Sequence, residues 1–286
     1  MIRMDVLLKD AKKRNYGVAA PNAWNMESVR SIFEVANELK SPVVIDVATF
    51  HNIGECASLC RYYESKYPNV VYALNLDHGG TFEDCIQAIR YGFSSIMVDR
   101  SELPFEDNVR EVAELVKIAH ACGVSVEAEL GHVGVGEEYE TTRDAGLTRL
   151  EEAKEFVERT NVDCLAVSVG TSHGTYKGEP HLEFELLKKL SNEIEIPLVL
   201  HGGSGTGDEN LYKAVKLGIQ KINLATDLIV NGMDYMFESF GENNCNVERN
   251  TVYGASLLDS FSEGYKNKLA YYMNLFESTG KAGEND

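Results

Sequence analysis

The stretch Tyr72-Ala73-Leu74-Asn75-Leu76-Asp77-His78-Gly79-Gly80 decides how this chain is interpreted. An apolar run ends abruptly in a carboxylate, an imidazole and two glycines. This pattern is typical of a buried strand whose C-terminal end opens onto a functional site, although a helix cap followed by a satisfied histidine has the same appearance. The choice between the two depends on how the other strands of the chain end.

Alternating strand and helix patterns predict the fold class. Eight short apolar runs predict strands at residues 16–20, 42–47, 70–76, 94–98, 125–130, 164–169, 196–200 and 219–224. Apolar residues at three- and four-residue spacing predict helices at residues 26–39, 82–91, 108–121, 150–159, 182–190 and 210–217. Near-continuous apolar strands that alternate with helices indicate a parallel sheet covered on both faces.

Eight such units in 286 residues predict an α/β fold, specifically a (β/α)8 TIM barrel with a C-terminal helical extension. An open, doubly wound sheet is the alternative. It is disfavoured because Pro21-Asn22-Ala23-Trp24-Asn25 follows the first predicted strand, where a dinucleotide-binding sheet would have a glycine-rich turn.

No linker divides the chain, so residues 1–286 are expected to form a single domain. The barrel is expected at residues 1–230, and a helical arm for packing or dimerisation at residues 231–286. A long glycine-rich connection at residues 131–147 follows the fifth predicted strand, and such loops in compact barrels are usually active-site lids.

The overall composition limits which partners and which cellular compartment are expected. The net charge of −18 argues against nucleic acid and anionic membranes as partners. The N-terminus has no apolar signal region and no run of about 18 apolar residues occurs, which predicts a cytoplasmic protein. The six cysteines form no complete metal-binding pattern and are expected to be reduced thiols.

Histidines gather at the predicted strand ends, where barrels of this kind carry their functional residues. Four of the seven histidines lie at or just past such an end: His78, His132, His173 and His201. His78, His173 and His201 each end a strand directly and precede a glycine, whereas His132 begins a loop. Three neutral imidazoles from different strands suit a catalytic zinc ion, which keeps one position open for substrate.

Acidic and glycine-rich segments complete the predicted site. Asp99 and Glu129 are expected to orient the histidines or to hold a second cation. Gly202-Gly203-Ser204-Gly205 follows the seventh strand, where many barrels bind phosphate, although a plain tight turn is the alternative. Thr226 could add a hydroxyl and Gly174 an amide to the same cradle.

This combination predicts a metal-dependent aldol cleavage. A metal ion at the histidines can polarise a carbonyl and stabilise an enediolate. Asp77 can exchange a proton with an aldehyde or alkoxide oxygen, and a loop glutamate can remove a carbon-bound proton.

The chain resembles the class II, zinc-dependent ketose-bisphosphate aldolases, which include fructose-bisphosphate and tagatose-bisphosphate aldolases. The matching stretches appear in the family's order over about residues 1–230 and are residues 76–79, 95–101, 126–131, 169–177, 200–205 and 221–227. The resemblance implies zinc on His78, His173 and His201, with Glu129 near an alternative, buried metal position. It also implies a homodimer or homotetramer.

The resemblance further implies a role for each reacting group. Asp77 would protonate the nascent aldehyde oxygen, Glu137 would abstract the hydroxymethyl proton of dihydroxyacetone phosphate, and Asn223 would contact the enediolate. The site for the phosphate on C1, where a monovalent cation such as Na⁺ or K⁺ often also sits, matches Gly174, Gly202, Ser204 and Thr226. Asn22 and Arg100 are assigned to the aldehyde side.

Departures from the family pattern concern the aldehyde side. Asn75 stands where many members have His, and Ala225 where a polar residue is common. The tail lacks the Asp-Pro-Arg segment of many members, with Ala255 at that place and Arg249 as the one arginine of the tail. The expected substrate is a ketose 1-phosphate or 1,6-bisphosphate, and a non-bisphosphate sugar or sugar-acid 1-phosphate is the alternative.

Three other activities are weaker alternatives. A metal-dependent isomerase or hydrolase could use the same barrel. A Schiff-base aldolase would need a desolvated lysine, for which Lys177 and Lys221 are the near candidates. An inactive sugar-phosphate-binding protein would not need to keep the reacting residues.

Overall fold

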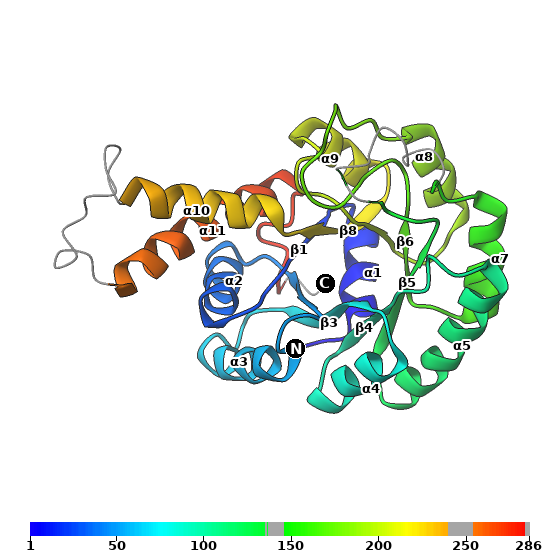
Figure 1. Cartoon of the computed structure of the whole chain (residues 1–286), viewed down its shortest axis with the longest axis horizontal. Helices are drawn as coiled ribbons and strands as arrows, with labels where there is room; N and C mark the ends of the chain where they lie inside the picture. Colours follow the sequence, from blue (N-terminus) through cyan, green and yellow to red (C-terminus); the bar gives the residue numbers. More distant parts are fainter. Residues whose placement is uncertain (135, 137–145, 240–253, 284–286) are drawn as a thin grey trace.

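The computed structural model describes residues 1–134, 136, 146–239 and 254–283. Within them, eight parallel strands form a nearly closed barrel, which confirms the predicted TIM-barrel fold (Figure 1). The strands are β1 (Val18–Pro21), β2 (Val43–Ala48), β3 (Tyr72–Gly79), β4 (Ser95–Val98), β5 (Ser125–Leu130), β6 (Cys164–Val167), β7 (Leu198–Leu200) and β8 (Ile219–Leu224). Their hydrogen-bonded order is β1-β8-β7-β6-β5-β4-β3-β2, and a single bridge between Asn22 and Asp46 joins β1 to β2.

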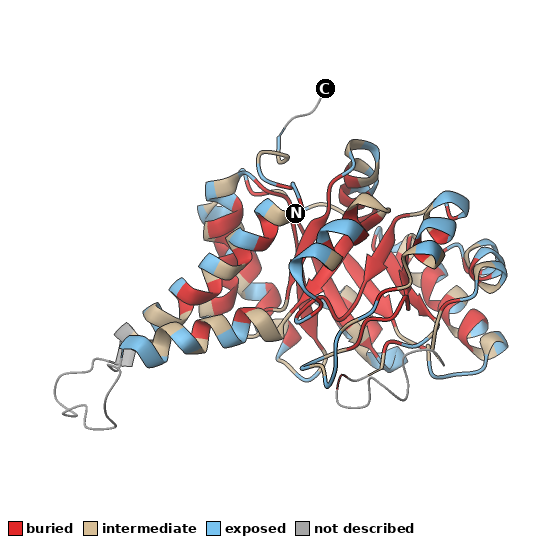
Figure 2. Cartoon of the chain, turned by 90° about the horizontal axis from the view of Figure 1, so that it is seen from above, coloured by how far each residue is buried: buried red, intermediate tan, exposed pale blue. Residues whose placement is uncertain are grey.

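The helices that follow β1 to β7 cover the outside of the barrel. They are α2 (Met26–Leu39), α3 (Ile53–Lys66), α4 (Phe82–Tyr91), α5 (Phe105–Ala121), α7 (Leu150–Thr160), α8 (Phe184–Glu193) and α9 (Asp208–Lys216). Local sequence sets their limits: α4 begins at a capping box between Thr81 and Asp84 and ends at Gly92 in the left-handed conformation. Their apolar faces and the outer face of the sheet form one large core, visible as the buried layer in Figure 2.

Helix α1 (Met4–Arg14) was not predicted, and it closes the N-terminal end of the barrel. Met4, Leu7, Leu8 and Ala11 pack against small inward-facing side chains of the strands, which form a second core cluster. The sequence lacks a start signal for this helix, because Arg3 makes no side-chain cap. In the described structure α1 therefore fills this end of the barrel interior.

Helices α10 (Thr226–Ser239) and α11 (Gly254–Leu275) extend to one side of the barrel (Figures 1 and 2). The predicted boundary at residue 230 lies inside α10. The arm is also part of the barrel wall, because Tyr265, Leu269 and Met273 of α11 are fully buried in the main core. None of the described helices is long and apolar enough to cross a membrane.

Candidate active site

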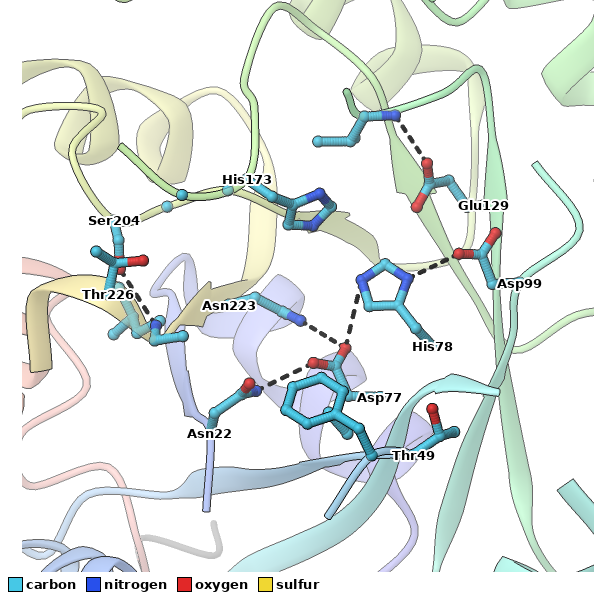
Figure 3. Close-up of a pocket in the computed structure, with 18 of the residues that line it drawn as sticks. Asn22, Thr49, Asp77, His78, Asp99, Glu129, His173, Ser204, Asn223 and Thr226 are labelled. Carbon is cyan, nitrogen blue, oxygen red and sulfur yellow. Dashed lines mark hydrogen bonds and ion pairs between the residues drawn. The ribbon is translucent and has the colours of Figure 1, made fainter. Parts of the chain in front are cut away.

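A cavity of about 510 Å³ opens at the C-terminal ends of the strands (Figure 3). Most of the residues predicted for the site line it: Asn22, Asp77, His78, Glu129, His173, Gly174, Gly202, Ser204, Asn223 and Thr226. His201 is fully buried at the same end and lies close to the other two histidines. Residues from β1, β3, β5, β6, β7 and β8 and the loops after them are thus brought together. Glu137 lies outside the described residues.

The end of β3 bends so that two adjacent side chains reach the cavity. Neighbouring residues of a regular strand point to opposite faces. Here His78 has φ 52° in the left-handed region, and the pairing register with β4 shifts between Leu76 and Gly79. Gly79 permits this bend, because a Cβ there would lie 2.6 Å from the Met97 carbonyl oxygen. As a result Asp77 and His78 both line the cavity.

The three strand-end histidines converge on one point. Their ring centroids are 4.8 to 5.7 Å apart, and one ring nitrogen from each lies within 4.8 Å of the others. His78 Nδ1 lies 2.7 Å from Asp99 Oδ2, and His201 Nε2 lies 2.7 Å from Glu127 Oε1. These carboxylates hold protons on the outer nitrogens, so His78 Nε2 and His201 Nδ1 are the nitrogens available to a metal ion. Burial would lower the pKa of His78, but Asp77 and Asp99 outweigh it and raise the pKa to about 10, so a metal ion would displace a proton from Nε2.

His173 presents its free nitrogen to the same point. Its ring bonds to the backbone of Val133, while its Nε2 is buried and has no hydrogen-bond partner in the described structure. Burial and the neighbouring His201 and His78 rings lower the pKa of His173 to about 3, so the imidazole is neutral. A buried ring nitrogen without a partner is costly, and a metal ion would satisfy it.

A second group of potential ligands shares His78. One atom each from His78, Asp99 and Glu129 also lie within 4.8 Å of one another. Glu129 Oε1 accepts a hydrogen bond from the Val133 amide at 2.9 Å, while its Oε2 is buried without a partner in the described structure. Burial and the Asp99 charge raise the pKa of Glu129 to about 8. These acidic groups could hold a cation beside the histidines.

Asp77 is held by two amides. Asn22 Nδ2 donates to Asp77 Oδ2 at 3.0 Å, and Asn223 Nδ2 donates to Oδ1 at 3.1 Å (Figure 3). Burial opposes ionisation, but interactions with the His78 and His201 rings, the Lys221 ammonium and the Asn22 hydrogen bond outweigh it and lower the pKa of Asp77 to about 2. Its Oδ1 lies 3.8 Å from His78 Nε2. The carboxylate is therefore ionised beside the point where the histidines meet.

Two loops form a cradle on the opposite side of the histidines from Asp99. Ser204 Oγ accepts hydrogen bonds from the amides of Ala225 and Asp227, both at 3.2 Å, and so joins the β7 loop to the first turn of α10. Gly202 has φ 68°, and a Cβ there would lie 2.3 Å from the Ser172 carbonyl oxygen. Backbone amides, small residues and a helix N-terminus together suit an anion such as phosphate.

Tyr176 braces this cradle and was not predicted as a site residue. Its hydroxyl accepts a hydrogen bond from the Ser172 amide at 2.8 Å and donates to the Gly202 carbonyl at 3.1 Å. The same hydroxyl lies 3.0 Å from Thr206 Oγ1. The sequence offered no signal beyond its position four residues after Ser172.

The structure does not bring Arg100 into the cavity. Its Nε lies 2.6 Å from Glu111 Oε2, and its guanidinium donates to the Gly79 carbonyl at 3.0 Å. The side chain is buried, with 7% of its surface exposed, and it is not among the cavity-lining residues. It supports the end of β3 from behind, where no aldehyde could reach it.

Three further residues of the site were not predicted to have a role: Glu127 on β5, and Thr49 and Phe50 in the loop after β2. Glu127 alternates with Glu129 on β5, so both side chains point into the barrel. Two acidic residues on the inner face of one strand are an unusual pattern, and this was the available signal. Thr49 and Phe50 also line the cavity, and no sequence pattern marked them.

Comparison with known proteins confirms the resemblance seen in the sequence. The sequence model of the family "Fructose-bisphosphate aldolase class-II" matches residues 2–281. The chain is 37% identical to the fructose-bisphosphate aldolase of Thermus caldophilus, over 96% of this chain and 98% of that protein. It is 39% identical to a probable fructose-bisphosphate aldolase of Bacillus subtilis, over 79% and 82% of the two chains.

A solved structure agrees with the sequence comparison. The crystal structure of the YdjI aldolase from Escherichia coli K12 superposes with a TM-score of 0.85 at 32% identity. The superposition covers 99% of this chain and 100% of the YdjI aldolase chain.

Proposed function

The chain belongs to the class-II fructose-bisphosphate aldolase family and is a lyase, and from this premise we propose a zinc-dependent aldolase that reversibly cleaves a ketose phosphate. The products would be dihydroxyacetone phosphate and an aldehyde. The family is generally metal-dependent, and its members act on phosphorylated sugars. The observation that carries the proposal is the convergence of three histidine nitrogens beside an ionised aspartate.

The donor set fits zinc. Three imidazoles with fixed tautomers provide three nitrogen ligands, and the buried Nε2 of His173 has no hydrogen-bond partner in the described structure. Three protein ligands leave room for substrate, as catalytic zinc sites require. A bound zinc ion would supply a Lewis acid that polarises the substrate carbonyl and stabilises negative charge on the adjacent carbon. Glu129 would contribute to an alternative cation position with His78 and Asp99.

The cradle would hold the C1 phosphate. Gly174, Gly202, Ser204 and Thr226 line one side of the cavity, and the N-terminus of α10 adds a favourable dipole for an anion. A monovalent cation, Na⁺ or K⁺, would share this site, because no lysine or arginine lines the cradle within the described residues. Anchoring the phosphate here directs the sugar chain across the histidines toward Asp77.

Asp77 would carry the proton of the aldehyde oxygen. Its ionised carboxylate accepts hydrogen bonds from Asn22 and Asn223, so both oxygens are held in a defined orientation. In the cleavage direction it accepts the proton from the C4 hydroxyl, and in the condensation direction it returns the proton. Asn223 would also donate to the developing enediolate oxygen, and Asn22 lies on the aldehyde side. Glu137 would move the proton at carbon.

A specific observation favours one of the two expected substrates over the other. Within the described part of the chain, neither a lysine nor an arginine side chain lines the cavity. Asp99, which lies across the histidines from Ser204 and Thr226 in Figure 3, lines the cavity, and so does Glu102. Acidic groups disfavour a second phosphate and suit a hydroxyl-rich aldehyde. A ketose 1-phosphate is therefore preferred to a 1,6-bisphosphate.

The arm would mediate a homodimer or homotetramer. Ile229, Val230, Phe237 and Leu258 of α10 and α11 expose between 38% and 59% of their surface. Exposed apolar residues on one structural unit are typical of an interface between subunits. We also place the protein in the cytoplasm, because the described cysteines are free thiols.

A retro-aldol screen tests the proposal. Ketose 1-phosphates and 1,6-bisphosphates would be incubated with the zinc-loaded protein, and dihydroxyacetone phosphate would be detected with a coupled dehydrogenase. The proposal predicts dihydroxyacetone phosphate from at least one ketose 1-phosphate. A substrate that is converted to an isomeric sugar phosphate without carbon–carbon cleavage would instead establish the isomerase alternative.

A further inference from the structure

A lysine is buried inside the barrel below the histidines. Lys221 on β8 is 0% exposed, and its Nζ lies 2.9 Å from Glu127 Oε2 and 3.1 Å from Asp46 Oδ2. Both carboxylates are also 0% exposed. Buried ion pairs are a weak source of stability, since apolar residues of similar volume often replace them without loss. The presence of three ionisable groups in this core therefore needs an explanation other than stability.

These groups belong to a chain of hydrogen bonds and one ion pair that ends at a histidine of the site. Asn75 Nδ2 donates to Asp46 Oδ1 at 2.9 Å, and Asp46 Oδ2 pairs with Lys221. Lys221 donates to one oxygen of Glu127, and the other oxygen lies 2.7 Å from His201 Nε2. The chain links β3, β2, β8, β5 and the end of β7.

Glu127 determines which nitrogen of His201 faces the cavity end. Because Glu127 is a carboxylate, His201 Nε2 carries the proton and Nδ1 carries the lone pair. Asn223 Nδ2, a donor, lies 3.4 Å from that Nδ1, which is consistent with this tautomer. A Glu127 side chain that rotated away would no longer impose this arrangement.

Lys221 is what holds Glu127 in this orientation. Its ammonium donates to Glu127 Oε2 at 2.9 Å while Oε1 faces His201 Nε2 at 2.7 Å, so rotation of the carboxylate would break both contacts. The other two histidines need no such counter-ion, because Asp99 is partly exposed and His173 bonds to backbone. Burial would lower the pKa of Lys221, but Asp46, Glu127 and Asp77 outweigh it and raise the pKa above its ordinary range, which disfavours Lys221 as a Schiff-base nucleophile.

We propose that Lys221 is a positioning residue for metal binding: its ammonium holds the Glu127 carboxylate, and Glu127 fixes His201 with Nδ1 toward the metal position. This inference rests on the proposed function, because it concerns one ligand of the proposed zinc site. The expected size of the effect follows from partners of metal-ligating histidines, whose loss typically weakens metal binding by about 10- to 100-fold.

The test compares three variants of the full chain. Lys221→Met removes the ammonium at similar length but leaves Glu127 as an unpaired buried charge. The double variant Lys221→Met/Glu127→Gln removes both charges, so it should fold even where the single variant is unstable. Lys266→Met is the matched control, because Lys266 also lies between two carboxylates, Glu34 at 3.3 Å and Glu263 at 2.9 Å, but on the outside of the barrel.

Zinc affinity would be measured by competition with a chelator. The tautomer of His201 would be read from ¹⁵N shifts of the metal-free protein, with the His201 signals identified by their loss in His201→Asn. The double variant should bind zinc about 10- to 100-fold more weakly and show a mixture of His201 tautomers. The control should match the parent in both measurements.

Two results would count against the inference in different ways. A double variant with parental zinc affinity and a single His201 tautomer would refute the role of Lys221 and leave the proposed function standing. A parent protein that binds no zinc would contradict the proposed function, and the inference with it.

Discussion

The role of Asp77 can be tested by replacing one oxygen of its carboxylate with an NH₂ group. Asp77→Asn keeps the size and shape of a side chain that is 5% exposed, so the barrel should fold normally. Asn22 and Asn223 both donate to the present carboxylate, at 3.0 and 3.1 Å. An amide at position 77 can accept from only one of them through its oxygen, and it cannot take up a proton near neutral pH.

The magnitude of the loss follows from the function that is removed. General acid–base catalysis by one positioned group typically contributes about 10²- to 10⁴-fold to the rate. At about 1.36 kcal/mol per tenfold change, this corresponds to an increase of about 2.7 to 5.4 kcal/mol in the activation barrier. The mismatched amide should cost about 1 to 3 kcal/mol of folding free energy in addition, which thermal unfolding would report.

Two measurable reactions distinguish proton transfer at the aldehyde oxygen from proton transfer at carbon. Cleavage of the ketose phosphate needs both steps, whereas exchange of a carbon-bound hydrogen of dihydroxyacetone phosphate with deuterated solvent needs only the step at carbon. In Asp77→Asn, cleavage should fall by about 10²- to 10⁴-fold while exchange stays within about tenfold of the parent and zinc remains bound. NMR of dihydroxyacetone phosphate in deuterium oxide measures the exchange directly.

The reasoning would be refuted in two ways. Unchanged cleavage would remove Asp77 from the proton path. Equal losses of cleavage and exchange with zinc still bound would mean that Asp77 acts before the two steps diverge, through substrate binding or metal electrostatics.

Three other changes test the cradle and the barrel. Gly202→Ala would place a Cβ 2.3 Å from the Ser172 carbonyl, so it should destabilise the fold by about 1 to 3 kcal/mol and raise KM for the phosphorylated substrate. Gly174→Ala is its control, since Gly174 also has a positive φ of 81° but a Cβ there meets nothing within 4 Å; equal KM changes would contradict the clash. Tyr176→Phe leaves the Ser172 amide without its 2.8 Å partner and should cost about 1 to 3 kcal/mol of folding free energy, measured by denaturant unfolding, while Tyr212→Phe on the surface should cost less than about 1 kcal/mol. Burial would raise the pKa of Asp5, but Lys9 and Arg3 outweigh it and hold the pKa below 3.8, so its stabilisation is present above about pH 4 and lost as pH falls below that. Asp5→Asn should therefore lower Tm at pH 7 more than at pH 3, and an equal loss at both values would contradict this.

The fold and most of the cavity were accessible from sequence because both follow from short-range patterns. Each strand is a short apolar run, and parallel strands in a barrel must present their C-terminal ends on one face. His78, His173 and His201 could therefore be grouped from their positions at strand ends without any knowledge of distances. Helix α1 escaped prediction because its start carries no capping residue and its apolar face covers the barrel end, which no local pattern reveals.

Side-chain partners across the barrel could not be predicted in the same way. Arg100 follows a strand end, yet it turns behind β3 to reach Glu111, and this direction depends on packing. From the sequence, Lys221 was a candidate Schiff-base nucleophile. In the structure it pairs with Asp46 and Glu127, which come from strands far away in the sequence and meet it inside the barrel. Such contacts depend on register and tilt of the strands, which single-strand patterns do not contain.

Metal dependence of the cleavage reaction tests the central claim most directly. The protein would be stripped with EDTA, dialysed, and assayed for dihydroxyacetone phosphate from a ketose 1-phosphate before and after zinc is added back. The His78, His173 and His201 site predicts no turnover in the stripped protein and full recovery at about one zinc ion per chain. Full turnover in the stripped protein, with borohydride trapping the substrate on a lysine, would contradict the account.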